Sequence, residues 1–257
     1  MRQNSVVATR SLVWEEMPVR PDLVSGEVHL LSAFTAEDRI PREADWALLT
    51  EPEKRRARRF KFDYHRNRWV AGRCGLKRIL GIYVGCSSAE IRLRYGDIGK
   101  PYLDNRGSKS LMFNYTDSGG YLIYAIGLEQ ELGIDLEHLP RATNYAGLAR
   151  KKLSEREKCA FDALEESACC DAFLAHWTRK EAYGKALGVG IRYSMKDVTL
   201  CEDYANSEYQ RHDDEHGTIH LSQIQPPFSG ISTLAVVGAA VRLRAFQLPQ
   251  VLESSPN

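Results

Sequence analysis

Two carboxylates, Asp135 and Glu137, are separated by one residue in the segment Gly-Ile-Asp-Leu-Glu. In an extended strand, side chains two positions apart point to the same face, so this spacing predicts that the two acids project side by side. Carboxylates this close repel each other unless a cation lies between them. Oxygen ligands suit Mg²⁺, which takes one or two carboxylates together with water and substrate phosphate. The alternative interpretation of these two residues alone is a solvated strand face.

A second group recurs at every fourth residue: Trp177, Glu181 and Lys185. On a helix this spacing places all three side chains on one stripe. Glu181 could then serve as a third oxygen ligand or as a general base, and Lys185 could neutralise a phosphate. The alternative interpretation is an exposed Glu–Lys ion pair beside a core tryptophan, which would contribute only a few tenths of a kcal/mol.

A third feature is the polar segment Phe-Asn-Tyr-Thr-Asp-Ser-Gly-Gly at residues 113–120, just before a predicted strand. We interpret it as a hydroxyl-rich turn whose N–H and O–H groups could face an anion. The segment lacks the spacing of a Walker A loop, and the chain contains no Gly-x-Gly-x-x-Gly motif. Alone it is more typical of an ordinary turn.

The charge of the chain is balanced overall but unevenly distributed. Lys and Arg number 35 and Asp and Glu 34, yet eleven cations and only one acid, Asp63, lie between Lys54 and Arg78. A basic segment in one half and acids in the other predict a polyanionic ligand, met by cations on one side and by a metal on the other. Aromatic residues among these cations leave nucleic-acid binding as an alternative, although no nucleic-acid motif is present and the paired acids would be unexplained.

The elements that must position these residues alternate between strands and helices. The chain has 257 residues, of which 43% are hydrophobic and 27% charged, which is typical of a folded protein with one large or two small domains. Periodicity predicts a mixed α+β fold in which residues 121–127 and 132–139 form a hairpin. Predicted strands are residues 27–34, 91–95, 121–127, 132–139, 218–224 and 233–241, and predicted helices are residues 52–60, 66–83, 168–187 and one that begins at Ser154.

The chain shows no apolar run long enough for a membrane span, and the charged residues among its first 21 lead us to expect no secretory leader. None of its six cysteines forms a Cys-x-x-Cys pair, which argues against a zinc ribbon or a thioredoxin-like site. We therefore expect reduced thiols in a cytoplasmic protein that does not bind membranes.

In combination, these motifs resemble the 4'-phosphopantetheinyl transferases of the Sfp type. That family carries a Gly-Ile-Asp-x-Glu strand, here residues 133–137, and a Trp-x-x-Lys-Glu-(Ala/Ser)-x-x-Lys helix, here residues 177–185. The basic segments at residues 53–60 and 66–78, the Gly-Lys-Pro turn at residues 99–101 and the polar segment at residues 113–119 also resemble the family. The resemblance covers roughly residues 27–245.

The resemblance implies two similar α+β lobes, related by a pseudo-twofold axis, that pack around a central ligand cleft. We expect an N-terminal lobe with the basic helices at residues 1–108, a C-terminal lobe with the acidic motifs at residues 109–248, and a flexible tail at residues 249–257. The implied reaction is the transfer of 4'-phosphopantetheine from coenzyme A to a serine of an apo acyl or peptidyl carrier protein, with release of adenosine 3',5'-bisphosphate. The implied enzyme depends on Mg²⁺, binds no nucleic acid and is expected to be a monomer.

Residue roles follow from the resemblance by position. Asp135, Glu137 and Glu181 would hold Mg²⁺ on the pyrophosphate, Glu181 would also act as the base for the carrier serine, and Lys185 would stabilise phosphate charge. Positions near the nucleotide or its phosphates are Arg56, Arg68, Lys100, Thr116 and Asp117.

Asp117 departs from the family pattern, because the family usually has histidine there. A carboxylate would repel the pyrophosphate, so we expect Asp117 to turn away or to join or water-bridge the metal shell; the third outcome is weaker binding of coenzyme A. A sharp rise in the Michaelis constant for coenzyme A in Asp117→His would contradict this expectation. The departure also leaves open a family member that binds coenzyme A or a carrier protein without catalysis.

Overall fold

The computed structural model describes residues 7–36, 38–104, 111–139, 145–189, 194–204, 206 and 208–248. The tail predicted at residues 249–257 lies outside these ranges. Two main sheets and six helices occupy them, so the mixed α+β class is confirmed. None of the helices in these ranges combines the length and the apolar character that a membrane span requires.

The first sheet has five strands in the order β1-β11-β2-β6-β5. β11 pairs in parallel with both β1 and β2, whereas β2–β6 and β6–β5 are antiparallel. The strands are β1 (Trp14–Glu16), β2 (Glu27–Phe34), β5 (Leu111–Ser118), β6 (Tyr121–Leu128) and β11 (Arg242–Gln247). A separate two-stranded ribbon consists of β3 (Leu93–Tyr95) and β4 (Pro101–Leu103).

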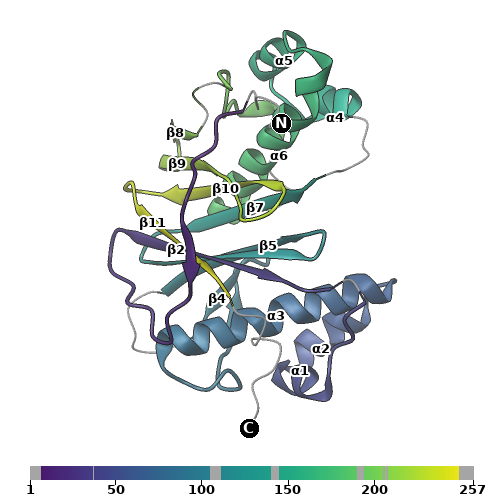
Figure 1. Cartoon of the computed structure of the whole chain (residues 1–257), viewed down its shortest axis with the longest axis vertical. Helices are drawn as coiled ribbons and strands as arrows, with labels where there is room; N and C mark the ends of the chain where they lie inside the picture. Colours follow the sequence, from purple (N-terminus) through teal and green to yellow (C-terminus); the bar gives the residue numbers. More distant parts are fainter. Residues whose placement is uncertain are drawn as a thin grey trace.

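The second sheet is antiparallel, with four strands in the order β7-β10-β9-β8. Its strands are β7 (Leu132–His138), β8 (Tyr209–Asp214), β9 (Gly217–Ile224) and β10 (Gly230–Val237). Apolar side chains of the two sheets meet in one buried core, which includes Leu30 and Ile123 from the first sheet and Ile134 and Leu234 from the second. The two sheets therefore pack face to face in the middle of the molecule (Figure 1).

Helices cover the outer face of each sheet, which gives an α–β–β–α layering (Figure 1). Helices α1 (Glu43–Leu48), α2 (Glu51–Arg58) and α3 (Asp63–Val84) lie beside the first sheet, and α4 (Tyr145–Lys152), α5 (Glu155–Asp162) and α6 (Glu166–Leu187) lie beside the second. A short 3₁₀ turn follows at Met195–Asp197.

The helix boundaries follow local sequence signals. The capping box predicted at Ser154 is present, with the Ser154 hydroxyl accepting from the N–H of Glu157. The two long helices, α3 and α6, both end at a glycine in the left-handed region, Gly85 at φ 71° and Gly188 at φ 68°. Of these two 22-residue helices, α3 carries Arg68, and α6 carries Glu181 and Lys185.

Two sequence-based expectations are wrong. Residues 121–127 and 132–139 do not form a hairpin, because β6 pairs with β2 and β5 while β7 pairs with β10 in the other sheet. Residues 113–118 do not form a turn, because they belong to β5, and only Gly119 and Gly120 make the connection to β6. In the first case the partner strands β2 and β10 are distant in the sequence, so local composition carried no information about them. In the second case the partner is the adjacent β6, and the polar residues of β5 concealed the strand.

The sheets do not divide the chain at residue 108. β5 and β6, which follow that position, belong to the first sheet, and β11 returns to the first sheet from the C-terminal end of the chain. The division into two lobes at residue 108, and the pseudo-twofold relation between them, stay predictions.

Candidate active site

The candidate site lies at a seam between the two sheets, where β5 and β7 run side by side without a backbone ladder. Alternate side chains of β5 bridge the seam. Asn114 Oδ1 accepts from the N–H of Ile134 at 3.0 Å, Thr116 Oγ1 donates to Asp135 Oδ1 at 3.3 Å, and Ser118 Oγ donates to Glu137 Oε2 at 3.2 Å. The strand period of two therefore fixes both carboxylates of β7 against one face of β5.

Helix α6 approaches β7 so closely at Gly133 that no side chain fits between them. A Cβ atom at Gly133 would lie 2.0 Å from the carbonyl oxygen of Ala182 and 2.4 Å from the nitrogen of Ala186. This contact brings the C-terminal half of α6 over the acidic strand. As a result Lys185 Nζ donates to the carbonyl oxygen of Ile134 at 3.0 Å and to Asp135 Oδ1 at 2.6 Å.

Asp135 is the most perturbed of the site's acids. Its side chain is buried, and burial is the main cause that raises its pKa to about 6. The negative charges of Glu181 and Glu137 raise the pKa further, whereas the Lys185 ammonium opposes the rise. The three predicted acids are therefore near enough to interact, and one lysine does not fully compensate their charge.

Cations face these acids from the opposite wall. Two guanidinium groups lie near the Trp69 ring, with Arg56 5.6 Å and Arg73 5.3 Å from its centroid. Arg73 is 3% exposed and sits 3.8 Å from Glu53, and no described residue hydrogen-bonds its Nε or Nη1 atom. Glu53 in turn is fixed by Lys77 at 2.8 Å, so a buried ion network holds Arg73 in place.

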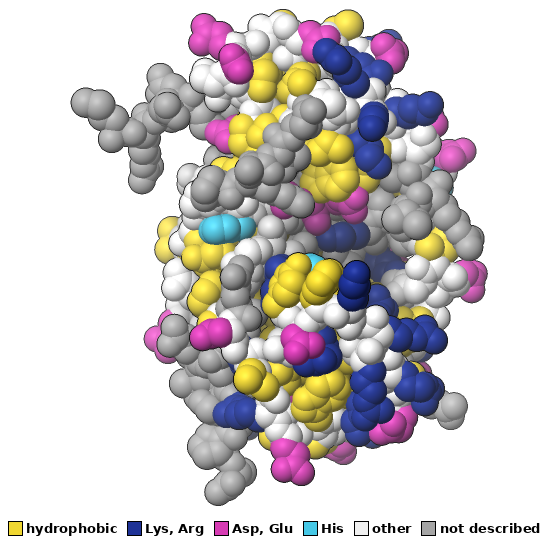
Figure 2. All heavy atoms as spheres, turned by 90° about the vertical axis from the view of Figure 1, so that its right-hand side faces the viewer, with side chains coloured by type: hydrophobic (Ala, Val, Ile, Leu, Met, Phe, Trp, Pro, Cys, Tyr) yellow, Lys and Arg dark blue, Asp and Glu magenta, His cyan; other side chains and the backbone are white. Residues whose placement is uncertain are grey.

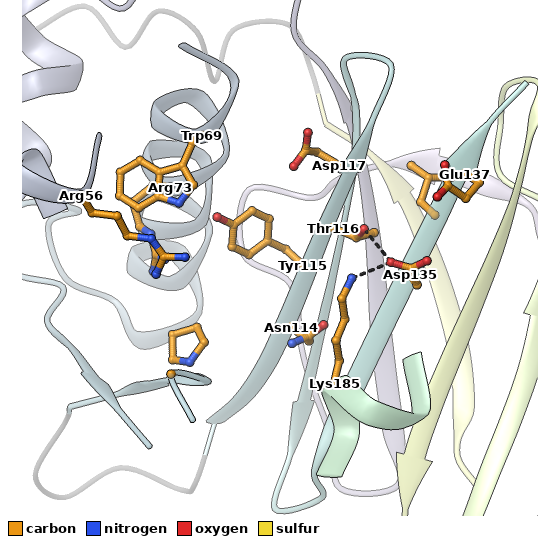
Figure 3. Close-up of a pocket in the computed structure, with 13 residues that line it drawn as sticks. Arg56, Trp69, Arg73, Asn114, Tyr115, Thr116, Asp117, Asp135, Glu137 and Lys185 are labelled. Atoms are coloured by element: carbon orange, nitrogen blue, oxygen red, sulfur yellow. Dashed lines mark hydrogen bonds and ion pairs between the residues drawn. The ribbon is translucent and has the colours of Figure 1, made fainter. Parts of the chain in front are cut away.

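A pocket of about 380 Å³ separates the acidic wall from the cationic wall. Figure 3 shows Arg56, Trp69 and Arg73 on the side of α2 and α3, and Asp135, Glu137 and Lys185 on the side of β7 and α6. In Figure 2 a hollow at mid-height of the molecule contains side chains of both charges. The lining residues are Arg56, Trp69, Arg73, Gly99, Pro101, Asn114, Tyr115, Thr116, Asp117, Asp135, Leu136, Glu137 and Lys185.

Asp117 lies on the other face of β5 from Thr116 and forms an ion pair with Arg68 of α3. It still lines the pocket and is 36% exposed at the side chain. Asp117 therefore points towards α3 and away from the acids of β7, while still lining the pocket. Its charge is compensated by the Arg68 cation of α3.

Lys100 is engaged by residues around the acidic wall rather than exposed in the pocket. Its ammonium donates to Glu131 Oε2 at 2.5 Å, to the carbonyl oxygen of Leu132 at 3.0 Å and to that of Ala186 at 2.7 Å. Lys100 is buried and is not among the pocket-lining residues, although its neighbours Gly99 and Pro101 are. These hydrogen bonds connect the β3–β4 turn to β7 and α6 next to the pocket.

The structure brings together most of the residues singled out from the sequence. Those that line the pocket are Arg56, Thr116, Asp117, Asp135, Glu137 and Lys185. Arg68 and Glu181 do not line the pocket but interact with residues that do. Arg68 forms an ion pair with Asp117, and the charge of Glu181 raises the pKa of Asp135.

No individual site role was predicted from the sequence for the other seven lining residues, which are Trp69, Arg73, Gly99, Pro101, Asn114, Tyr115 and Leu136. The spacing of Trp69 and Arg73, four residues apart on one helix face, was a usable signal for a cation held on an aromatic ring.

The residues of the acidic wall suit a divalent cation by their chemistry. Asp135 and Glu137 are each 7% exposed, offer only oxygen, and carry more negative charge with Glu181 than Lys185 balances. Within the described ranges, no three His, Cys, Asp or Glu side chains are already grouped as a metal centre would hold them. A cation bound by Asp135 would share this carboxylate with Lys185, which contacts its Oδ1 atom.

The raised pKa of Asp135 predicts that the folded protein is less stable when this carboxyl group is ionised than when it is protonated. The folded state binds this proton more tightly than the unfolded chain does, since the pKa rises from 3.8 to about 6. The stabilising contribution is thus complete below about pH 4 and is lost as the pH rises through 6. With EDTA present at pH 8, we expect Asp135→Asn to be more stable than the wild type by about 1–3 kcal/mol.

Thermal melting of both proteins at pH 8 and pH 5 measures this effect. At pH 5 the wild-type carboxyl is largely protonated, so the advantage of Asp135→Asn should shrink. An unchanged or lower melting temperature of Asp135→Asn at pH 8 would contradict this explanation of the site.

Comparison with known proteins agrees with these motifs. Residues 131–233 match the model of the 4'-phosphopantetheinyl transferase superfamily. The chain is 35% identical over 179 residues to the 4'-phosphopantetheinyl transferase HetI of Nostoc sp. strain PCC 7120, an alignment that covers 69% of this chain and 76% of HetI. It is 25% identical over 179 residues to the L-aminoadipate-semialdehyde dehydrogenase-phosphopantetheinyl transferase of Xenopus laevis, covering 65% of this chain and 59% of that relative.

A relative from Thraustochytrium sp. named phosphopantetheinyl transferase is 25% identical over 166 residues, covering 60% of this chain and 58% of the relative. The acidic strand β7 and the helix α6, which build one wall of the pocket, both lie within the residues matched by the superfamily model. This chain belongs to the 4'-phosphopantetheinyl transferase superfamily.

Proposed function

We propose that this transferase moves the 4'-phosphopantetheine group of coenzyme A to a serine hydroxyl of an apo acyl or peptidyl carrier protein, in a reaction that requires Mg²⁺ and releases adenosine 3',5'-bisphosphate. One observation carries the proposal. The buried carboxylates of β7 face two guanidinium groups, one of them the buried Arg73, across a pocket of about 380 Å³. A pyrophosphate donor needs both a metal-binding wall and a cationic wall.

Asp135, Glu137 and Glu181 are the residues that would hold Mg²⁺. When bound, the ion would neutralise charge on the pyrophosphate oxygens of the donor. Lys185, which now contacts Asp135 at 2.6 Å, is near enough to stabilise the same charge once the carboxylate binds the ion. Asn114 and Ser118 would keep the carboxylates aligned, because they bond the backbone N–H groups of Ile134 and His138.

Transfer requires a base for the serine hydroxyl, and Glu181 is the candidate, directly or through a water molecule. The serine oxygen would attack the phosphorus that carries the pantetheine arm. The new serine O–P bond would replace the P–O bond to the leaving adenosine 3',5'-bisphosphate, and the serine proton would pass to Glu181 and then to solvent.

The cationic wall is suited to the phosphates of the nucleotide end. Arg56 and Arg73 both line the pocket, and Arg73 keeps two polar atoms that no described residue hydrogen-bonds. The Arg73 guanidinium is already desolvated and held by Glu53. It could therefore give a phosphate strong, charge-assisted hydrogen bonds with little further loss of conformational entropy. Arg73 thereby joins Arg56 as a candidate phosphate ligand.

The ion pair between Arg68 and Asp117 predicts that removing Arg68 weakens coenzyme A binding and that also removing Asp117 restores it. Arg68→Ala would leave the Asp117 carboxylate uncompensated in a pocket for an anion, and we expect the Michaelis constant for coenzyme A to rise about tenfold. Adding Asp117→Ala should reverse most of that rise, because the repulsion is then removed. Steady-state kinetics of the two single variants and the double variant measure this coupling. A double variant as weak as Arg68→Ala would mean that Arg68 itself binds the donor.

A non-catalytic coenzyme A or carrier-protein binder is the competing function, and Asp117 was its only support. The ion pair with Arg68 weakens that support by neutralising the charge at this position. Nucleic-acid binding would not explain the buried carboxylates of the acidic wall. Chromatographic detection of adenosine 3',5'-bisphosphate tests the proposal: its release should require coenzyme A, apo carrier and Mg²⁺ together. Binding of coenzyme A without release would favour the non-catalytic alternative.

Three broader features stay proposals. A monomeric enzyme is proposed because one chain contains both the acidic wall and the cationic wall that the donor would need. The two-lobe arrangement is supported by the two long helices, α3 and α6, that cover separate sheets, whereas β5, β6 and β11 all follow residue 108 and belong to the first sheet. A cytoplasmic location follows only from the expectation that the six cysteines are reduced thiols.

A further inference from the structure

The corner between α2 and α3 exposes aromatic rings among uncompensated cations. We define this α2–α3 corner as Arg58, Arg59, Lys61, Phe62 and Tyr64, all of which are exposed. Phe62 is 50% and Tyr64 48% exposed. Their rings stack at 5.9 Å, and Lys61 Nζ lies 5.3 Å from the centroid of the Phe62 ring. Rings ordered in this way present a preformed apolar platform to solvent.

The acids near the corner are already engaged. Asp63 pairs with Arg66 at 3.0 Å, Glu51 pairs with Lys54 at 2.9 Å, and Glu53 is buried against Lys77. Among the described residues, no ion pair involves Arg58, Arg59 or Lys61. The side of the molecule seen in Figure 2 carries many Lys and Arg side chains over its lower half. The corner thus combines aromatic residues with arginine, a composition enriched in protein interfaces.

The corner is continuous with the wall of the pocket. Phe60, which joins α2 to the corner, contacts Trp69 at a centroid distance of 6.1 Å, and Trp69 lines the pocket together with Arg56. A macromolecule that reaches the pocket from this side would therefore touch the corner. Because the corner is basic and apolar, the complementary surface is acidic and amphipathic.

We propose that the α2–α3 corner docks an acidic, amphipathic surface of the carrier protein beside its acceptor serine. This inference rests on the proposed function and adds to it the surface that recognises the partner. The cations would steer the encounter, and Phe62 and Tyr64 would supply the buried centre of the interface. The donor would be unaffected, because none of the five residues lines the pocket.

Two variants of the full-length protein test the proposal, each with the apo carrier varied at saturating coenzyme A. In Arg58→Glu/Lys61→Glu we expect the Michaelis constant for the carrier to rise about tenfold or more, and its salt dependence to be lost. In Phe62→Ala/Tyr64→Ala we expect a rise of about fivefold that retains the salt dependence of the wild type. The turnover number and the Michaelis constant for coenzyme A should stay within about twofold.

The matched control reverses two exposed arginines elsewhere, Arg156→Glu/Arg211→Glu, at 76% and 63% side-chain exposure. It should leave the Michaelis constant for the carrier unchanged. Wild-type constants in both corner variants would overturn the inference alone, as would tight binding of an oligonucleotide that the carrier does not displace. Absence of turnover in the wild type would instead overturn the proposed function, and the inference with it.

Discussion

Asp135→Asn is expected to lower the turnover number for carrier modification by about 10²- to 10³-fold. The Asp135 carboxylate lies at the centre of the acidic wall, 2.6 Å from Lys185 Nζ and within 3.3 Å of Thr116 Oγ1. An amide of the same size keeps the packing but removes the charge that a divalent cation needs. The measurement is the initial rate of holo-carrier formation at saturating coenzyme A and Mg²⁺.

Glu215→Gln is the matched control, because Glu215 is 87% exposed and does not line the pocket. It should retain the wild-type rate. The Asp135→Asn protein should at the same time melt at a higher temperature at pH 8, so the lost activity cannot be assigned to unfolding. A variant that keeps more than about a tenth of the wild-type rate would contradict the role given to Asp135.

Gly133→Ala is expected to be the most damaging glycine-to-alanine change among the glycines that the structure describes. Its Cβ would lie 2.0 Å from a backbone oxygen and 2.4 Å from a backbone nitrogen of α6, and backbone atoms in a packed helix cannot step aside. We expect a loss of more than about 3 kcal/mol of unfolding free energy. A domain of this size would then melt about 10 °C lower.

Gly127→Ala is the graded control for this effect. The new Cβ would meet side-chain methyl groups of Leu132 and Val28 at 3.2 Å, which can shift by a few tenths of an ångström. We expect a cost of about 1 kcal/mol. Activity should follow the same order, since displacing α6 from β7 also moves Glu181 and Lys185. Equal melting temperatures for the two variants would show that α6 does not pack on β7 as described.

The acidic motif could be predicted from the sequence because its geometry is local. One intervening residue in a strand places Asp135 and Glu137 on one face, and a four-residue step in a helix places Glu181 and Lys185 on one stripe. Gly133 also gains a physical meaning in the structure. It is the position at which helix and strand touch, so the glycine of the motif serves packing rather than chemistry.

The rest depended on contacts between distant segments. β5 reads as a polar turn because its alternating residues serve two partners: Thr116 and Ser118 face β7, while Tyr115 and Asp117 face α3. The local sequence pattern alone cannot predict that a strand has polar partners on both of its faces. The burial of Arg73 and the engagement of Lys100 were hidden for the same reason, since both follow from ion pairs and carbonyl groups remote in sequence.

The central claim is that the acidic and cationic walls together transfer phosphopantetheine. Intact mass spectrometry of an apo carrier protein, incubated with this protein, coenzyme A and Mg²⁺, tests it most directly, with EDTA and Glu181→Gln reactions in parallel. We predict that the carrier gains the mass of one phosphopantetheine group only with the wild type and Mg²⁺. An unmodified carrier in the wild-type reaction, or equal modification by Glu181→Gln, would contradict the claim.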